Sequence, residues 1–182
     1  NMHRVLQLHS TDQPEVHEIA ADMRAIADSY GAGRGERVLI GEIYLPVDRL
    51  LHYYGRERAE VHLPFNFQLI DAPWEASSLA TLIGNYEAAL PPGAWPNWVL
   101  GNHDRSRVAA KRGQAQARIA AMLLLTLRGT PILYYGDELG LSDVAIPSAQ
   151  VQDPRGLREP GLALGRDPVR TPMPWDGSEN AG

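Results

Sequence analysis

Helix-like and strand-like segments alternate along most of the chain, and this alternation limits the fold more than any other feature of the sequence. Apolar residues spaced by three and four predict helices, and short, nearly continuous apolar runs predict strands that are covered on both faces. The expected helices are 12–30, 45–54, 71–90 and 107–127, and the expected strands are 37–43, 61–69, 98–100 and 131–135. Such alternation is typical of parallel βα units, so the sequence predicts an α/β fold.

The predicted elements suggest where the regular part of the fold begins and ends. Asp12 can cap the first helix, Pro14 suits its first turn, and Glu15 lies three residues after Asp12. From residue 141 the sequence becomes rich in Pro and Gly, so 141–182 is predicted to be a long irregular loop region. The chain begins with Asn1 rather than Met and stops in a Gly-containing stretch, so we expect a fragment of a longer polypeptide.

Ionisable side chains follow three of the four predicted strands directly. Glu42 comes after 39–41, the triplet Asn102–Asp104 comes after 99–101, and the pair Asp137–Glu138 comes after 134–136. In a closed barrel of parallel strands, these strand ends would meet at the rim where active sites lie. An open doubly wound sheet is the simpler alternative, but the polar strand ends favour part of a barrel.

Glu42 and Asp104 are the pair of side chains best suited to catalysis. Two carboxyl groups at short separation suit glycoside hydrolysis, in which one protonates the leaving oxygen and another stabilises charge on the sugar ring. Each residue also has a simpler interpretation: Glu42 as a solvated strand end, and Asp104 as a cap of the helix that follows. Asp137 and Glu138 are expected to hold the rim together rather than to react.

Composition and charge limit the kinds of partner that this chain is expected to bind. The 182 residues carry a formal net charge of −5 and contain no cysteine. A mildly acidic chain without a basic patch does not suggest nucleic acid or an anionic membrane, and no apolar run approaches the length of a membrane span. The glycine-rich stretch 31–35 precedes a strand, whereas a dinucleotide-binding loop follows one. We therefore expect a small neutral substrate, no cofactor and no metal. The compartment is not indicated, although the cytoplasm is favoured.

Four segments, in order, resemble the α-amylase superfamily (glycoside hydrolase family 13). Gly41–Tyr44 resembles the region of the general acid, and Val99–Asp104 resembles the region of the aspartate that stabilises the transition state. Gly129–Glu138 is similar to the last barrel strand of that family. Arg170–Asp176 resembles the Arg-Thr-Pro-Met-Gln-Trp segment of the oligo-1,6-glucosidase and α-glucosidase branch.

The resemblance implies a fold and a role for each matching residue. Residues 1–140 would form strands five to eight of a (β/α)8 barrel, that is, its second half. Glu42 would be the general acid and base, and Asp104 would hold sugar hydroxyls and favour the distorted ring. His103 would hydrogen-bond the same sugar, and Arg170 would fix the non-reducing glucose. The resemblance thus implies a retaining, exo-acting α-glucosidase of short oligosaccharides.

Two departures from the family pattern affect this interpretation. The family's nucleophile is an Asp in a Gly-x-Arg-x-Asp context, and no such segment occurs in these residues. Position 174 is Pro where the common motif has Gln. Without the nucleophile, the chain alone is expected to be inactive. A half barrel would also expose two sheet edges, so self-association is expected.

Three alternatives stay open from the sequence alone. The same motifs serve transglycosylation, sucrose cleavage and trehalose synthesis. A non-catalytic relative could use the barrel as an interaction module. A flavodoxin-like sheet that binds a phosphorylated ligand is a third interpretation, but residues 41–46 lack the Gly-rich turn that it requires.

Overall fold

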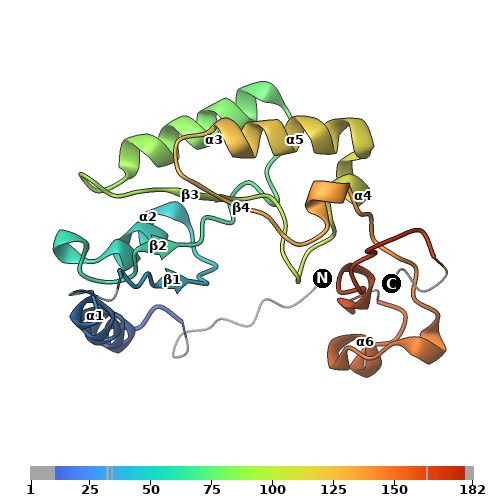
Figure 1. Cartoon of the computed structure of the whole chain (residues 1–182), viewed down its shortest axis with the longest axis horizontal. Coiled ribbons are helices and arrows are strands. Elements are labelled where there is room, and N and C mark those ends of the chain that lie inside the picture. Colours follow the sequence, from blue (N-terminus) through green and yellow to red (C-terminus); the bar gives the residue numbers. More distant parts are fainter. Residues whose placement is uncertain (1–10, 32, 34, 163, 179–182) are drawn as a thin grey trace. The chain divides into compact units, whose positions relative to one another are not determined.

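The structure is a computed structural model, and it describes residues 11–178 apart from 32, 34 and 163 (Figure 1). The ends of the predicted regular region and of the predicted loop region, 1–10 and 179–182, lie outside the described residues. The chain forms two compact units, which divide between Asn97 and Trp98.

The first unit contains the expected order of helix, strand, helix, strand and helix. The two strands are short and parallel, with Ile40 opposite Leu63 and Gly41 opposite Pro64. The elements are α1 (Pro14–Ser29), β1 (Ile40–Gly41), α2 (Val47–Leu50), the 3-10 turns η1 (Leu51–Tyr54) and η2 (Arg56–Arg58), β2 (Leu63–Pro64) and α3 (Ala76–Ala89).

Buried aromatic and amide side chains hold the first unit together. Tyr86 of α3 is fully buried, as the apolar spacing along this helix predicts. The hydroxyl of Tyr54 donates to the carbonyl of Trp95 at 2.9 Å. Asn97 is also fully buried; its Nδ2 donates to the Pro64 carbonyl at 2.6 Å, and its Oδ1 accepts from the Asn66 amide at 3.0 Å. This side chain satisfies buried backbone groups beside β2 that would otherwise lack partners.

The second unit carries the remaining strands and the irregular region. Fully buried Trp98 anchors β3, because its Nε1 donates to the Arg128 carbonyl at 2.8 Å just before β4. β3 and β4 pair as a two-stranded sheet. The elements are β3 (Asn97–Val99), which starts at the last residue of the first unit, α4 (Val108–Arg112), α5 (Gln114–Thr126), β4 (Thr130–Ile132), η3 (Asp137–Leu139), η4 (Ser148–Gln150), α6 (Pro154–Arg158) and η5 (Asp167–Val169).

Three details of the predicted elements are wrong. The single helix expected over 107–127 is broken at Gly113, whose φ of +82° ends α4 before α5 begins. Asp12 does not cap α1; the cap position is Gln13, and the Asp12 carboxylate pairs with Arg49 and His17 instead. The strands are two or three residues long, and the described strands pair as two separate two-stranded sheets rather than as one sheet of four.

Two helices leave part of their apolar surface in solvent. The exposed side chains are Ile19, Met23 and Ile26 of α1 and Ile119, Met122 and Leu125 of α5. Apolar stripes of this kind are usually buried against other protein surfaces. Among the described residues, no helix has both the length and the apolarity that crossing a membrane requires.

Candidate active site

The turn after β3 presents Asp104 beyond the end of a buried strand. Leu100 is buried, and a Cβ at Gly101 would lie 3.3 Å from Oδ2 of Asp137, so a side chain at this position would crowd that carboxylate. Asn102 is 9% exposed, and its Oδ1 accepts the backbone N–H of Asp104 at 3.0 Å. This side chain bond to the backbone two residues later sets the turn.

Neither Asn102 nor Asp104 caps the following helix. The cap position of α4 is Arg107, and no side chain hydrogen bond caps this helix. The helix-cap interpretation of Asp104 is therefore wrong, which leaves its carboxylate available for other partners.

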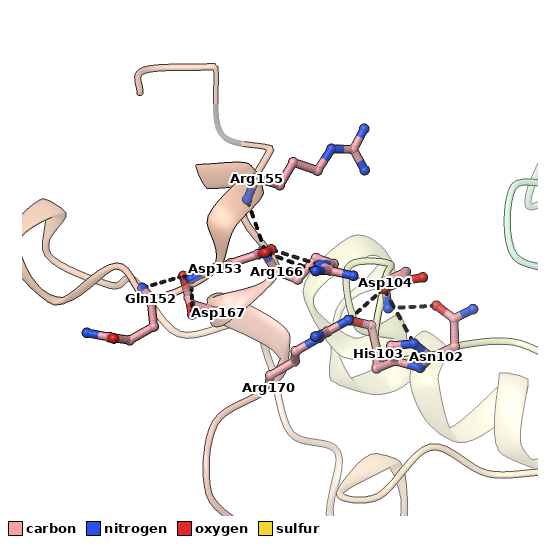
Figure 2. Close-up of polar contacts among 9 residues, drawn as sticks. All are labelled: Asn102, His103, Asp104, Gln152, Asp153, Arg155, Arg166, Asp167 and Arg170. Carbon is pink, nitrogen blue, oxygen red and sulfur yellow. Dashed lines mark hydrogen bonds and ion pairs between the residues drawn. The ribbon is translucent and has the colours of Figure 1, made fainter. Parts of the chain in front are cut away.

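Cations converge on one oxygen of Asp104 (Figure 2). Oδ1 accepts from Nη1 of Arg166 at 3.1 Å and from Nη2 of Arg170 at 2.7 Å. Nε2 of His103 lies 3.5 Å from the same atom. Partial burial of the carboxyl opposes its ionisation, but the bonds from Arg166 and Arg170 outweigh this effect and lower the pKa of Asp104. Asp104 is thus held as a carboxylate.

The second oxygen of Asp104 is open. Within the part of the chain that the structure describes, no hydrogen bond reaches Oδ2, and the side chain is 30% exposed. A carboxylate that is fixed through one oxygen and open at the other can accept hydrogen bonds from a ligand's hydroxyl groups.

His103 and Arg170, the two residues expected to bind the sugar, lie beside this carboxylate. Nε of Arg170 donates to the His103 carbonyl at 2.9 Å, which ties the turn after β3 to the segment after η5. The His103 side chain is 45% exposed, so its ring can meet a ligand. Three of the four residues singled out from the sequence therefore lie together in the second unit.

Arg166 and Asp153 complete the site and were not expected from the sequence. Nε and Nη2 of Arg166 donate to the two oxygens of Asp153 at 2.8 and 2.9 Å. A sequence signal was present in both cases. Asp153-Pro154 is a helix start, with a capping side chain and Pro at the first helical position, and Arg166 precedes Arg170 by four residues.

Buried Arg107 fastens the segment that carries Arg170. Its Nη1 donates to the Tyr135 carbonyl at 2.6 Å and its Nη2 to the Val169 carbonyl at 3.0 Å. The guanidinium lies 4.7 Å from the ring centre of Tyr134 and 4.8 Å from that of Tyr135. One side chain thus joins the end of β4 to the residue just before Arg170.

Asp137 is a structural neighbour of Arg107. One of its oxygens lies 3.8 Å from Nη1 of Arg107, and burial raises the pKa of Asp137 to about 6, although the nearby cation opposes this rise. This contact ties η3 to Arg107 within the second unit.

Glu42 lies in the first unit, at the end of β1. It directly follows Gly41, which pairs with Pro64 of β2, and its side chain is exposed. Two residues later, the ring of Tyr44 stacks on Phe67 with centroids 4.1 Å apart, which fixes the backbone beyond Glu42. The carboxyl group is thus presented to solvent at a strand end.

The site after β3 therefore offers a carboxylate with one open oxygen beside an exposed imidazole and two guanidinium groups. The family model described as the catalytic domain of alpha amylase matches residues 3–182. The chain therefore belongs to the alpha-amylase family, whose fold it shares as part of a barrel-like α/β structure.

Individual relatives agree with this assignment. A salivary alpha-glucosidase of Anopheles gambiae is 36% identical over 179 residues, which cover 94% of this chain and 30% of that protein. The human amino acid transporter heavy chain SLC3A1 is 33% identical, over 95% of this chain and 24% of that protein. The crystal structure of the alpha-glucosyl transfer enzyme XgtA matches 93% of this chain and 32% of its own, with a TM-score of 0.81 and 33% identity. The chain thus spans about a third of the length of the curated relatives it matches.

Proposed function

We propose that this chain supplies the acid/base and sugar-holding residues of a retaining, exo-acting α-glucosidase of short oligosaccharides. The observation that carries the proposal is the state of Asp104, which is fixed through Oδ1 by Arg166 and Arg170 and open at Oδ2. Asp104 is then ready to accept bonds from two adjacent hydroxyls of a glucose ring. Such bonds strengthen as the ring distorts towards the oxocarbenium-like transition state.

In this proposal Glu42 carries both proton transfers. It protonates the glycosidic oxygen as the leaving group departs, while a carboxylate nucleophile forms a covalent bond to the anomeric carbon. Glu42 then takes a proton from water, which attacks the anomeric carbon and releases glucose. No Gly-x-Arg-x-Asp segment occurs in the 182 residues, so we assign the nucleophile to upstream strands and the present strands to positions five to eight.

Arg170 and His103 would set the exo specificity. Arg170 is 36% exposed, its Nε and Nη2 bind the His103 carbonyl and Oδ1 of Asp104, and its Nη1 has no hydrogen-bond partner among the described residues, so this nitrogen can reach a ligand. A cation at this place, together with the His103 ring, would bind the terminal glucose and restrict cleavage to chain ends.

Two other functions are favoured by particular relatives. Similarity to an alpha-glucosyl transfer enzyme supports transfer of glucose to an acceptor other than water. Similarity to an amino acid transporter heavy chain supports an interaction module. Both would keep the present fold. The residue at the upstream nucleophile position separates them: an Asp there supports an enzyme, and another residue supports the module.

The 182-residue chain by itself is expected to release no p-nitrophenol from p-nitrophenyl α-glucoside. The reason is that the covalent route needs the upstream carboxylate. The longer polypeptide that includes the proposed upstream strands, called here the complete barrel, is expected to turn the substrate over. Both would be measured at equal concentration by absorbance. Turnover by the short chain at a rate close to that of the complete barrel would contradict the proposal.

A further inference from the structure

We propose that Arg166 is a positioning residue, which fixes the carboxylate of Asp104 for the sugar without touching the sugar itself; this inference rests on the proposed function. Arg166 contacts two carboxylates at once. Its Nε and Nη2 bind both oxygens of Asp153, and its remaining terminal nitrogen, Nη1, donates to Oδ1 of Asp104 at 3.1 Å (Figure 2).

The Asp153 end of this bridge is the anchor. Asp153 is 6% exposed, and in addition to the guanidinium it accepts the backbone N–H groups of Arg166 at 2.7 Å and of Arg155 at 3.2 Å. Its own amide donates to Asp167, at 3.1 and 3.0 Å to the two oxygens. The bonds from Arg166 keep the pKa of Asp153 well below its usual range, so the anchor stays ionised. An arginine held in two places by one carboxylate has little freedom left.

The Asp104 end of the bridge is the part that is positioned. Arg166 and Arg170 both bind Oδ1. Because both bonds go to the same oxygen, they fix the rotation of the carboxylate and leave Oδ2 open. The two arginines lie on either side of η5, four residues apart, so the same short turn fixes both. A planar guanidinium can bond two carboxylates in fixed directions, whereas the point charge of lysine cannot.

Arg166 and Arg170 should therefore act differently. Arg170 binds Asp104 and the His103 carbonyl through Nη2 and Nε, which leaves its Nη1 without a hydrogen-bond partner among the described residues, whereas all the side chain nitrogens of Arg166 are engaged with Asp153 and Asp104. Loss of Arg166 should leave the sugar contacts in place but let the carboxylate rotate. Because the transition state depends on that orientation, the loss should appear mainly in kcat rather than in KM.

The first test is an NMR titration of the carboxyl groups in the 182-residue chain, comparing wild type with Arg166→Met, Arg166→Lys and Arg155→Met. The pKa of Asp104 should rise towards its ordinary value in Arg166→Met, less in Arg166→Lys, and not at all in Arg155→Met. Arg155 is a matched control, because its exposed side chain points away from Asp153 in Figure 2. Asp176, whose pKa is lowered by Ser178, serves as an internal reference. An unchanged Asp104 in Arg166→Met would overturn the inference.

The second test measures kcat and KM for maltose in the complete barrel. Arg166→Met is expected to lower kcat about 100-fold with KM changed less than threefold, Arg166→Lys should recover part of the loss, and Arg155→Met should match wild type. A shifted Asp104 pKa with kcat unchanged would overturn the positioning role while the proposed function stands. An inactive wild-type barrel would overturn the proposed function and, with it, this role, even if the pKa shift confirmed the ion bridge.

Discussion

Asp104→Asn in the complete barrel is expected to lower kcat/KM for maltose by about 10²–10³-fold. The amide keeps the size of the side chain but loses the charge that Arg166 and Arg170 bind at Oδ1. The amide also presents either a weaker acceptor or an N–H donor to the sugar hydroxyls. A carboxylate oxygen, by contrast, can accept hydrogen bonds from these hydroxyls at both of its lone pairs. Steady-state kinetics on purified protein measure this effect.

Asp176→Asn is the matched control for this substitution. Asp176 lies in the same C-terminal segment, is exposed, and accepts hydrogen bonds from Ser178, including one from its amide at 2.8 Å. It should keep kcat/KM within twofold of wild type. Equal activities of the Asp104→Asn and wild-type proteins would mean that Asp104 does not hold the substrate.

Arg107→Met is expected to destabilise the chain by about 3–5 kcal/mol, because it removes a buried cation together with its hydrogen bonds to two carbonyls and its ion pair with Asp137. The Tyr135 carbonyl loses the Arg107 donor, the Val169 carbonyl loses one of two donors and keeps the Tyr134 hydroxyl, and Asp137 loses the cation that lies 3.8 Å away. Urea denaturation followed by circular dichroism measures the change in the free energy of unfolding. The free energy of unfolding of Arg107→Lys should lie between those of wild type and Arg107→Met, since lysine retains the charge but not the paired donors of arginine.

The loss of folding stability in Arg107→Met, called the deficit below, should depend on pH. Burial already raises the pKa of Asp137 to about 6 in the folded state, and loss of the cation raises it further. At a pH above the pKa of Asp137 in both folded proteins, the variant carries an ionised Asp137 without its cation, which lowers its free energy of unfolding further. Below about pH 6, Asp137 is protonated in both folded proteins and this contribution disappears. The deficit should therefore be larger at pH 8 than at pH 5. A deficit that is the same at both values would rule out Asp137 as the partner that matters.

The order of elements could be predicted from the sequence because apolar spacing is a local property. The burial of Tyr86 on α3 and of Trp98 in β3 follows from that spacing. The break at Gly113 could not be predicted, because glycine is tolerated within helices and its positive φ appears only in the structure. Strand length was overestimated, since apolar runs continue past the two or three residues that pair.

Candidate site residues could be proposed from the sequence where ionisable side chains follow strands or stand in family-like segments. They were missed where pairing between distant charges brings them together. Asp104, His103 and Arg170 stand in recognisable segments. Arg166 and Asp153 lie in a Pro- and Gly-rich region without periodicity, and Arg166 meets Asp104 across 62 positions of sequence. No local pattern specifies such a pair, because partner choice depends on how the irregular segment folds back.

The most direct measurement of the proposed chemistry is the configuration of the glucosyl azide that the complete barrel forms when Glu42 is replaced by alanine. p-Nitrophenol leaves without an acid, so the covalent intermediate still forms, but its hydrolysis lacks the general base and slows by about 10²–10⁴-fold. Azide needs no base and attacks the intermediate with a second inversion, so the expected product is α-glucosyl azide. Formation of β-glucosyl azide, or unchanged hydrolysis without any azide product, would contradict the assignment of Glu42 as the acid and base of a retaining α-glucosidase.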